Sequence, residues 1–422
     1  MKRITFFILS ILCFTACNND IDITNDIKTA EEVPQIELVM PDAAEVQVYS
    51  TATPSESEIR GIWVLVFDGN TLKHSERIDS SRIVKSTRSQ ALQLLPQLTN
   101  VDTGGADLGV FLNGKRIVCI ANSGVSTVPS SITPSTINAT FNFTKPYYSG
   151  GDSLPMYGEF LWPGNFTCEM TRVVAKVQVQ MGTSVSDVTG TFDAETVTYS
   201  IHNVWNSGQA ASAPATGTPV NTSDFSLVQK NNAPQSQTHA YVYETISSAS
   251  NTTFAANRHH ILLRAGAASY YRLDFFAGNE FLNIERNHHY LFTINKVRSA
   301  GYATPAEARM YPGGNIEYSI NVGDGRYATS NGQYAIVTSV DTLFVPATGT
   351  TTITAKIMGE ITALPTTNSI AYTAGLTGPA SFVAASLAAG QSIAVASSGF
   401  SGSGSITFKA GNITHVLPVR AQ

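Results

Sequence analysis

The sequence predicts an all-β protein of several domains, and three observations support this fold class. The chain has 422 residues, enough for two or three domains. Hydrophobic residues make up 43% of it and charged residues only 14%, so substantial cores can form. The apolar residues mostly occur in short alternating runs separated by turn residues, which is typical of many short strands.

The N-terminus has the pattern of an export signal. Lys2 and Arg3 precede a mostly apolar stretch over 4–14, which is too short to cross a bilayer as a helix. Ala16 and Cys17 follow, and a cysteine after small residues resembles a bacterial lipobox, in which the thiol receives a diacylglycerol. We therefore expect residues 1–17 to be a lipoprotein signal with Cys17 as the lipid-attachment site. An ordinary signal peptide with a chance cysteine is the alternative.

A polar tether and a first β-sandwich domain are expected next. Residues 18–58 are expected to form the tether and an N-terminal strand segment, and residues 59–169 the domain. The run Ile62–Phe67, closed by Asp68 and Gly69, is the most hydrophobic of the mature chain and predicts a strand buried on both faces. Other strands are expected at 35–40, 45–49 and 116–121, with a mixed segment at 82–98.

A second domain is expected over 170–326. It begins with an alternating run at 170–181, in which Val177 and Val179 share one face and Gln178 lies on the other, so we expect a half-solvated strand. Further strands are expected at 196–201, 240–243, 261–264, 270–276, 289–297 and 316–322.

From residue 327 to 422 charges are sparse and small residues dominate, which favours a small Ig-like β-sandwich. Its last run, 413–420, contains Pro418, which cannot supply a ladder hydrogen bond. We expect this run to close the domain through a turn at Gly411-Asn412, and not to act as a free donor strand. The other strands are expected at 343–345, 351–357, 392–396 and 405–408.

Several segments carry a family resemblance through their order and spacing across residues 55–325. They are Ile62–Gly69, Cys119–Asn122, Leu154–Gly158, Met170–Val177, Arg286–Tyr290, Gly301-Tyr302 and Ile316–Tyr318. Together they resemble the fimbrillin family of type V pili. The resemblance implies a lipoprotein precursor at the surface of the cell outer membrane, with two transthyretin-like Greek-key β-sandwich domains before the C-terminal one.

The resemblance also implies a function in fimbrium assembly and cell adhesion, with other fimbrial subunits as partners. Such subunits join by donor-strand exchange, in which one chain's strand fills the open groove of another. In the family a protease commonly cuts after an arginine near the N-terminus. Arg60 is the only arginine between Cys17 and the 62–67 strand, so it is the candidate processing site. An uncut linker is the alternative, and it would suit an anchor or accessory subunit. The extra C-terminal domain favours a tip or accessory role.

Two cysteines of the mature chain leave a question open. The oxidising compartment that export implies permits a disulfide between Cys119 and Cys168, whereas two free buried thiols are the alternative.

No chemistry-bearing motif is found in the sequence. The histidine pairs at 259–260 and 288–289 are adjacent on expected strands and therefore point to opposite faces, so we expect no metal site. Because neither a serine-nucleophile elbow nor a phosphate-binding loop is present, we expect no enzyme activity and no cofactor. The net charge of −5 has no basic stripe, which argues against nucleic acid as a partner.

A surface glycan-binding lipoprotein with an Ig-like spacer domain is the alternative function. Trp162, beside Pro163 and Gly164, is the best candidate for an exposed ring that stacks on a sugar. The partner would then be a host or bacterial surface glycan or protein.

Overall fold

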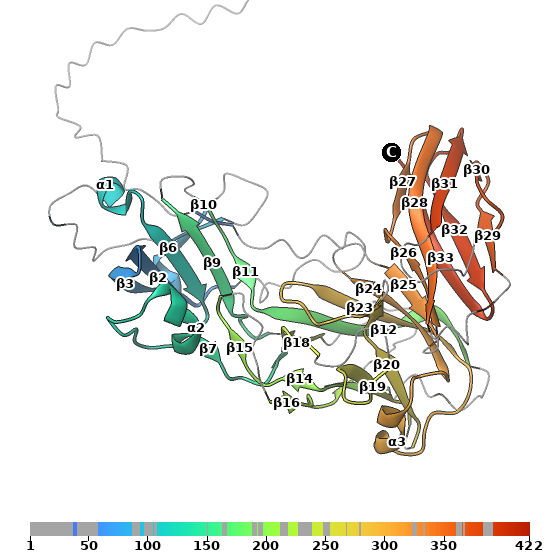
Figure 1. Ribbon diagram of the computed structural model, residues 1–422, viewed down its shortest axis with the longest axis horizontal. Helices are drawn as coiled ribbons and strands as arrows, with labels where there is room; N and C mark the ends of the chain where they lie inside the picture. Colours follow the sequence, from blue (N-terminus) through green and yellow to red (C-terminus); the bar gives the residue numbers. More distant parts are fainter. Residues whose placement is uncertain are drawn as a thin grey trace, which may run out of the picture. The chain divides into compact units, whose positions relative to one another are not determined.

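The computed structural model consists mainly of strands (Figure 1). It describes residues 37–39, 58–86, 93–96, 104, 108–149, 151–162, 167–187, 192, 197–211, 218–226, 239–247, 254–266, 268–277, 280–322, 327–331, 334–359, 365, 368–382 and 391–422. The expected strand at 45–49 and Cys17, the expected lipid-attachment site, lie outside the described residues. Within them, no helix is both long and apolar enough to cross a membrane. The prediction of an all-β sandwich fold is confirmed.

The first core lies between two sheets whose strand orders are β11-β9-β6-β2-β3 and β10-β1-β5-β4. The expected central strand is confirmed, because β2 pairs with β3 on one side and β6 on the other, and Val64 is fully buried. The short helix α2 adds Ile137 to the same core. The elements are β1 (Glu37–Val39), β2 (Gly61–Asp68), β3 (Thr71–Asp79), η2 (Ser80–Arg82), β4 (Ile83–Ser86), β5 (Gln93–Pro96), α1 (Leu108–Leu112), β6 (Arg116–Ala121), η3 (Pro134–Thr136), α2 (Ile137–Thr140), β7 (Asn142–Phe143), β8 (Tyr148–Ser149), β9 (Met156–Leu161), β10 (Thr167–Glu169) and β11 (Thr171–Arg172).

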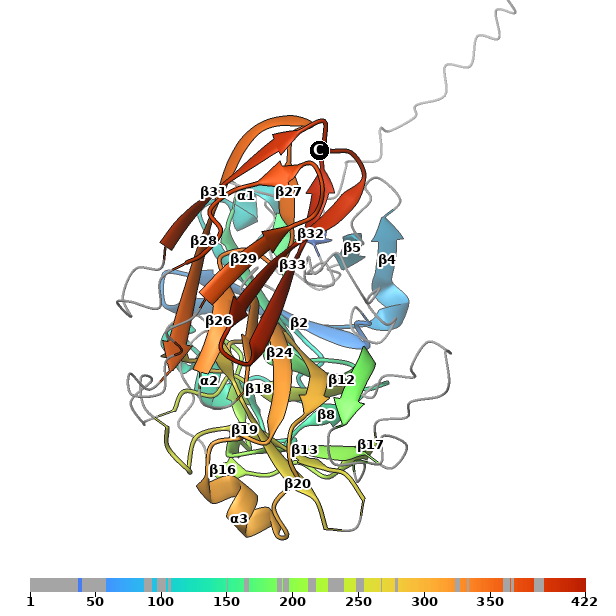
Figure 2. The same ribbon diagram turned by 90° about the vertical axis from the view of Figure 1, so that its right-hand side faces the viewer.

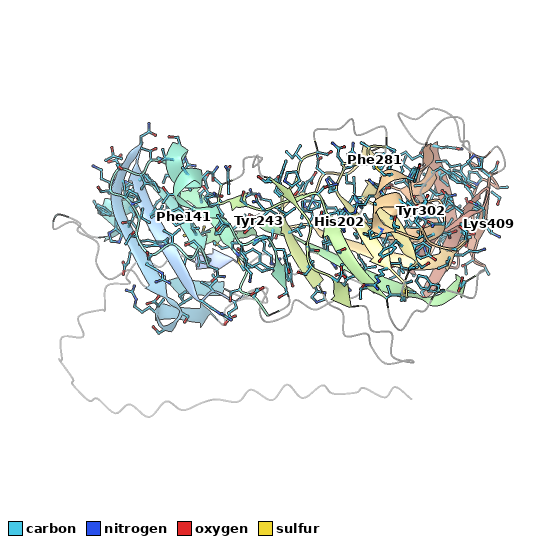
Figure 3. The ribbon with its side chains drawn as sticks, turned by 90° about the horizontal axis from the view of Figure 1, so that it is seen from below. Phe141, His202, Tyr243, Phe281, Tyr302 and Lys409 are labelled. Atoms are coloured by element: carbon cyan, nitrogen blue, oxygen red, sulfur yellow. The ribbon has the colours of Figure 1, made fainter. Side chains whose placement is uncertain are left out.

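The second core lies between the sheet β17-β13-β19-β20 and the strands β24, β23, β12 and β18. The elements are β12 (Val174–Asp187), β13 (Thr198–His202), β14 (Val204–Trp205), β15 (Gly208–Gln209), β16 (Pro219–Val220), β17 (Phe225–Ser226), β18 (His239–Tyr243), β19 (His260–Arg264), β20 (Tyr270–Asp274), β21 (Phe276–Ala277), β22 (Glu280–Phe281), β23 (His289–Val297), α3 (Pro305–Met310) and β24 (Ile316–Val322). Tyr243 of β18, labelled in Figure 3, packs into the first core instead.

The expectation of a half-solvated strand at 170–181 is wrong for much of its length. Strand β12 lies inside its sheet, between β18 and the parallel strand β23. Gln178, placed on the solvent face by the alternation, is 1% exposed and lies 3.2 Å from the His289 ring nitrogen, within hydrogen-bond distance. The polar side chain is tolerated in the interior because it has this partner.

The third core lies between the sheet β27-β33-β32-β29 and the strands β26, β28, β31 and β30 (Figure 2). The expected hairpin at Gly411-Asn412 is confirmed, since β32 and β33 pair from Ala410↔Ile413 onward and Gly411 has a positive φ of 53°. Pro418 does not interrupt β33; it pairs with Ser405 inside the strand. The elements are β25 (Tyr327–Ser330), β26 (Tyr334–Thr338), β27 (Leu343–Val345), β28 (Thr348–Gly359), β29 (Asn368–Tyr372), β30 (Leu376–Thr377), β31 (Gln391–Ser398), β32 (Ser403–Ala410) and β33 (Ile413–Ala421).

One ten-stranded sheet runs from the second core into the third, in the order β30-β31-β28-β26-β25-β24-β23-β12-β18-β8. Successive residues of β26 serve different cores: Ala335 and Val337 pack in the second, and Tyr334 and Ile336 in the third. The expected boundary at residue 327 therefore falls between hydrogen-bonded strands and not in a linker. We propose that the three cores correspond to the modules 59–169, 170–326 and 327–422.

A buried histidine fastens the last strand to this shared sheet. His415 of β33 is completely buried, and its two ring nitrogens lie 2.9 Å from the Thr329 hydroxyl and 3.0 Å from the Thr338 hydroxyl. Thr329 belongs to β25 and Thr338 to β26. The closing strand of the third core is thus tied directly to the strands that continue from the second.

Candidate functional site

Among the described residues, the N-terminal strand β1 is the candidate site for exchange with a strand of another chain. It is only three residues long and lies between two strands, parallel to β10 and antiparallel to β5. Leu38, at its centre, is fully buried in the first core. Removing β1 would therefore leave backbone groups of β10 and β5 unpaired, with an apolar gap where Leu38 lies.

Arg60, the candidate processing site, combines an exposed side chain with a paired backbone. Its side chain is 65% exposed and forms an ion pair of 3.2 Å with Glu58. Its backbone N–H donates to the Asn122 side-chain oxygen at 2.9 Å, and its carbonyl accepts from the Ser80 N–H at 3.2 Å. A protease can bind the guanidinium, but the peptide next to it must first leave these partners, so cleavage here depends on local opening.

Asn122 holds the segment before β2 in place. It adopts a left-handed backbone with φ of 56°, a conformation that asparagine tolerates better than most residues. Its side-chain nitrogen donates to the carbonyl oxygens of Glu58 and Leu154, both at 2.8 Å. Its own N–H donates to the Gly61 carbonyl at 2.9 Å. This geometry explains why asparagine ends the Cys119–Asn122 segment.

The C-terminal strand β33 is fully engaged within its own chain. It lies between β32, with which it pairs antiparallel, and β27, with which it pairs parallel over Leu343–Val345. Ile413, Leu417 and Val419 are buried in the third core. Val416, although apolar, is 44% exposed, because side chains alternate along the strand and His415 faces the interior. In this structure the strand closes the third sandwich.

Trp162 does not form the exposed sugar platform that the sequence suggested. It is 3% exposed, and its backbone exchanges hydrogen bonds with the turn between α1 and β6, donating to the Lys115 carbonyl at 2.9 Å. Trp63 is also buried, with its indole N–H donating to the Val125 carbonyl at 2.9 Å. The best candidate for an exposed ring is therefore buried, because Trp162 packs in the first core.

Each histidine of the pairs 259–260 and 288–289 has a polar contact within the chain. Among the described residues, no three His, Cys, Asp or Glu side chains group closely enough to hold a metal. His259 packs against Phe275, and its ring nitrogen lies 2.5 Å from the Leu282 carbonyl. His260 stacks on His202, which is labelled in Figure 3, with ring centroids 5.2 Å apart. Burial lowers the pKa of His202 and His259 to about 4 and that of His260 well below its usual value.

Two features near the second core, the buried Arg272 and helix α3, were not predicted from the sequence. Arg272 is completely buried; it pairs with Asp274 at 2.8 Å and donates to the Arg309 carbonyl of α3. The sequence does contain the signal for α3, because Thr304 and Glu307 form a capping box with a proline at the first helical position. Nothing in the local sequence marks Arg272 as buried.

The described fold defines an all-β protein with three sandwich cores. No family model and no curated protein matches the sequence. Among solved structures, the chain is similar to a fimbrial assembly protein of Parabacteroides distasonis, with 14% identity, a TM-score of 0.39, and 68% of this chain and 94% of that chain covered. It is similar to the truncated tip fimbrial protein of Porphyromonas gingivalis, with 14% identity, a TM-score of 0.37, and 68% and 99% covered. It is also similar to a fimbrilin of Porphyromonas gingivalis, with 12% identity, a TM-score of 0.42, and 68% of this chain and 96% of that chain covered.

Proposed function

We propose that this chain is a structural subunit of a cell-surface fimbrium that serves cell adhesion and is assembled by strand complementation. The position of β1 carries the proposal. A short strand from the N-terminal segment fills a slot between β10 and β5, and its one buried side chain, Leu38, completes the core. A strand of another subunit with an apolar residue at that place can occupy the same slot by β-augmentation.

A tip or accessory position suits the chain better than a stalk position. The closing strand β33 pairs with a strand on each side, and its His415 ring contacts the Thr329 hydroxyl of the shared sheet. Releasing it as a donor would expose the apolar face of the third core and unpair two strands. The subunit would thus accept a strand at β1 without offering one from its C-terminus.

A strand-exchange assay tests the acceptor slot. A protease site is placed in the 51–57 segment, the chain is cut, and a labelled peptide of residues 33–43 is added. We expect saturable binding to the cut chain and none to the uncut chain. The same peptide with Leu38→Asp is the matched control and should not bind, because a charge cannot enter the core. Equal binding of both peptides, or none of either, would refute the slot.

Immunogold labelling of filaments on the producing cells tests the position. Label at filament ends supports the tip, and label at the filament base supports an anchor or accessory subunit. Label along the whole filament would mean a stalk subunit, and label absent from filaments would overturn the fimbrial proposal.

As a complementary test, deletion of residues 413–422 should make the third module protease-sensitive. A truncated chain that stays resistant and loses only oligomerisation would identify β33 as a donor.

Attachment to the outer membrane through Cys17 is part of the proposal. We expect Cys17→Ala to abolish labelling with a palmitate analogue and to release the chain from the membrane fraction. Labelling that survives the substitution would exclude Cys17 as the lipid site.

A further inference from the structure

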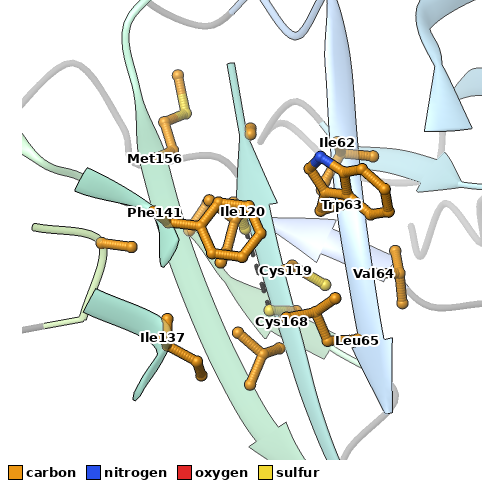
Figure 4. Close-up of a cluster of buried hydrophobic side chains, with 14 of the residues drawn as sticks. Ile62, Trp63, Val64, Leu65, Cys119, Ile120, Ile137, Phe141, Met156 and Cys168 are labelled. Atoms are coloured by element: carbon orange, nitrogen blue, oxygen red, sulfur yellow. Dashed lines mark hydrogen bonds between the residues drawn. The ribbon is translucent and has the colours of Figure 1, made fainter. Parts of the chain in front are cut away.

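The two described cysteines lie against each other inside the first core (Figure 4). Both are completely buried and are free thiols in this structure. They come from different sheets, Cys119 from the interior strand β6 and Cys168 from β10. A hydrogen bond with Cys168, together with burial, raises the pKa of the Cys119 thiol.

A glycine makes this contact possible. Gly158 of β9 is the direct cross-strand neighbour of Cys119, so a side chain at 158 would stand beside the Cys119 side chain. The space is instead filled by sulfur, because a Cβ atom at 158 would lie 2.7 Å from Cys168 Sγ. It would also lie 2.6 Å from the Glu169 carbonyl oxygen. The missing side chain thus lets Cys168 approach Cys119 across the core.

We propose that Cys119 and Cys168 form a disulfide when the chain folds in an oxidising environment. The bond joins β6 to β10 and so cross-links the two sheets of the first sandwich. Cys168 is also the register partner of Leu38, so the bridge fixes the strand against which β1 pairs.

The oxidation is a thiol–disulfide exchange with a low-molecular-weight disulfide such as glutathione disulfide. One cysteine thiolate attacks the oxidant, whose sulfur–sulfur bond breaks, giving a mixed disulfide and one glutathione thiol. The second cysteine then attacks the mixed disulfide, forms the Sγ–Sγ bond and releases the second glutathione thiol. Because both residues are fully buried in the folded chain, the exchange takes place before the core closes.

The test is to refold the full chain with glutathione disulfide and glutathione, block free thiols in denaturant, and digest with a glutamate-specific protease. Cleavage at Glu159 separates Cys119 from Cys168. We expect a linked pair of peptides that reduction separates. Blocked thiols at both positions would overturn the proposal, as would either cysteine linked only to Cys13 or Cys17.

Thermal unfolding gives an independent readout. Reduction should lower the melting temperature of the oxidised chain by several degrees, because the closed loop no longer restricts the unfolded state. The double variant Cys119→Ala/Cys168→Ala should show the same melting temperature with and without reductant. Equal sensitivity of the two proteins to reductant would contradict the bridge.

Discussion

The side-chain oxygen of Asn122 accepts a hydrogen bond from the backbone N–H of Arg60 at 2.9 Å. The two residues are 62 positions apart in the chain, yet this contact pairs the backbone of the candidate processing site. The Asn122 side chain also holds Glu58 through its carbonyl. The Asn122 amide therefore makes two of the hydrogen bonds that hold the segment before β2, and the Ser80 N–H makes another to the Arg60 carbonyl.

Replacing Asn122 by glycine should speed cleavage after Arg60. Glycine keeps the left-handed backbone without strain but removes the amide. Each lost hydrogen bond contributes about 1 kcal/mol, so two lost contacts to the 58–60 segment should raise trypsin cleavage more than tenfold. Asn203→Gly is the matched control, because Asn203 also has a positive φ but lies in the second module. Cleavage of the variant at the wild-type rate would mean that Asn122 does not protect this bond.

A charge in the middle of β2 should unfold the first module. Val64 is fully buried, and Val64→Asp would place a carboxylate in the core without a partner, at a cost of several kcal/mol. Thermal unfolding followed by tryptophan fluorescence measures the effect, because Trp63 and Trp162 both lie in the first core. Thr71→Asp, on the exposed end of β3, should change little. A midpoint for Val64→Asp within a few degrees of wild type would show that the strand is not central.

The buried pair of Arg272 and Asp274 should show strong coupling. Arg272→Met leaves the Asp274 carboxylate buried without its ion pair, which typically costs about 3–5 kcal/mol. Adding Asp274→Asn should restore part of the loss, because the unpaired charge is gone. Urea unfolding of wild type, both single variants and the double variant gives the coupling energy. A double variant less stable than Arg272→Met would contradict this account.

Acid should weaken the third module through His415. Burial lowers its pKa to about 3, whereas an unfolded histidine has a pKa of about 6.5. Above about pH 6.5 the His415 ring is neutral in both the folded and the unfolded chain. As pH falls from about 6.5 toward 3, only the unfolded chain takes up this proton, so the free energy of unfolding drops by about 1.4 kcal/mol per pH unit.

His415→Gln removes this titration and should reduce the pH dependence of stability by one proton. The free energy of unfolding is measured at pH 7 and pH 4.5 by amide exchange across β33. His202 and His259, whose pKa values are also lowered, keep their own contribution in the second module. An unchanged slope for β33 in the variant would show that His415 is not the group that titrates.

Local sequence determined much of the strand inventory. The continuous apolar run of β2 and the turn at Gly411-Asn412 were predictable because hydrophobic pattern and turn chemistry act over a few residues. Helix α3 was predictable in principle from its capping box, although it was not predicted. The candidate cleavage residue Arg60 and the cysteine pair could be named from the sequence, but not their surroundings.

Tertiary structure alone decided which segments meet. Strand β1 pairs with β10, about 130 residues later, and no local periodicity specifies a parallel pairing at that separation. Gln178 is buried because neighbouring strands flank β12, although the local alternation placed it on the solvent face. Trp162, the best candidate for an exposed ring, packs in the first core. Sulfur contact between Cys119 and Cys168 depends on the missing side chain of Gly158. Sequence periodicity reports which face of a strand is apolar, whereas long-range pairing determines what covers the other face.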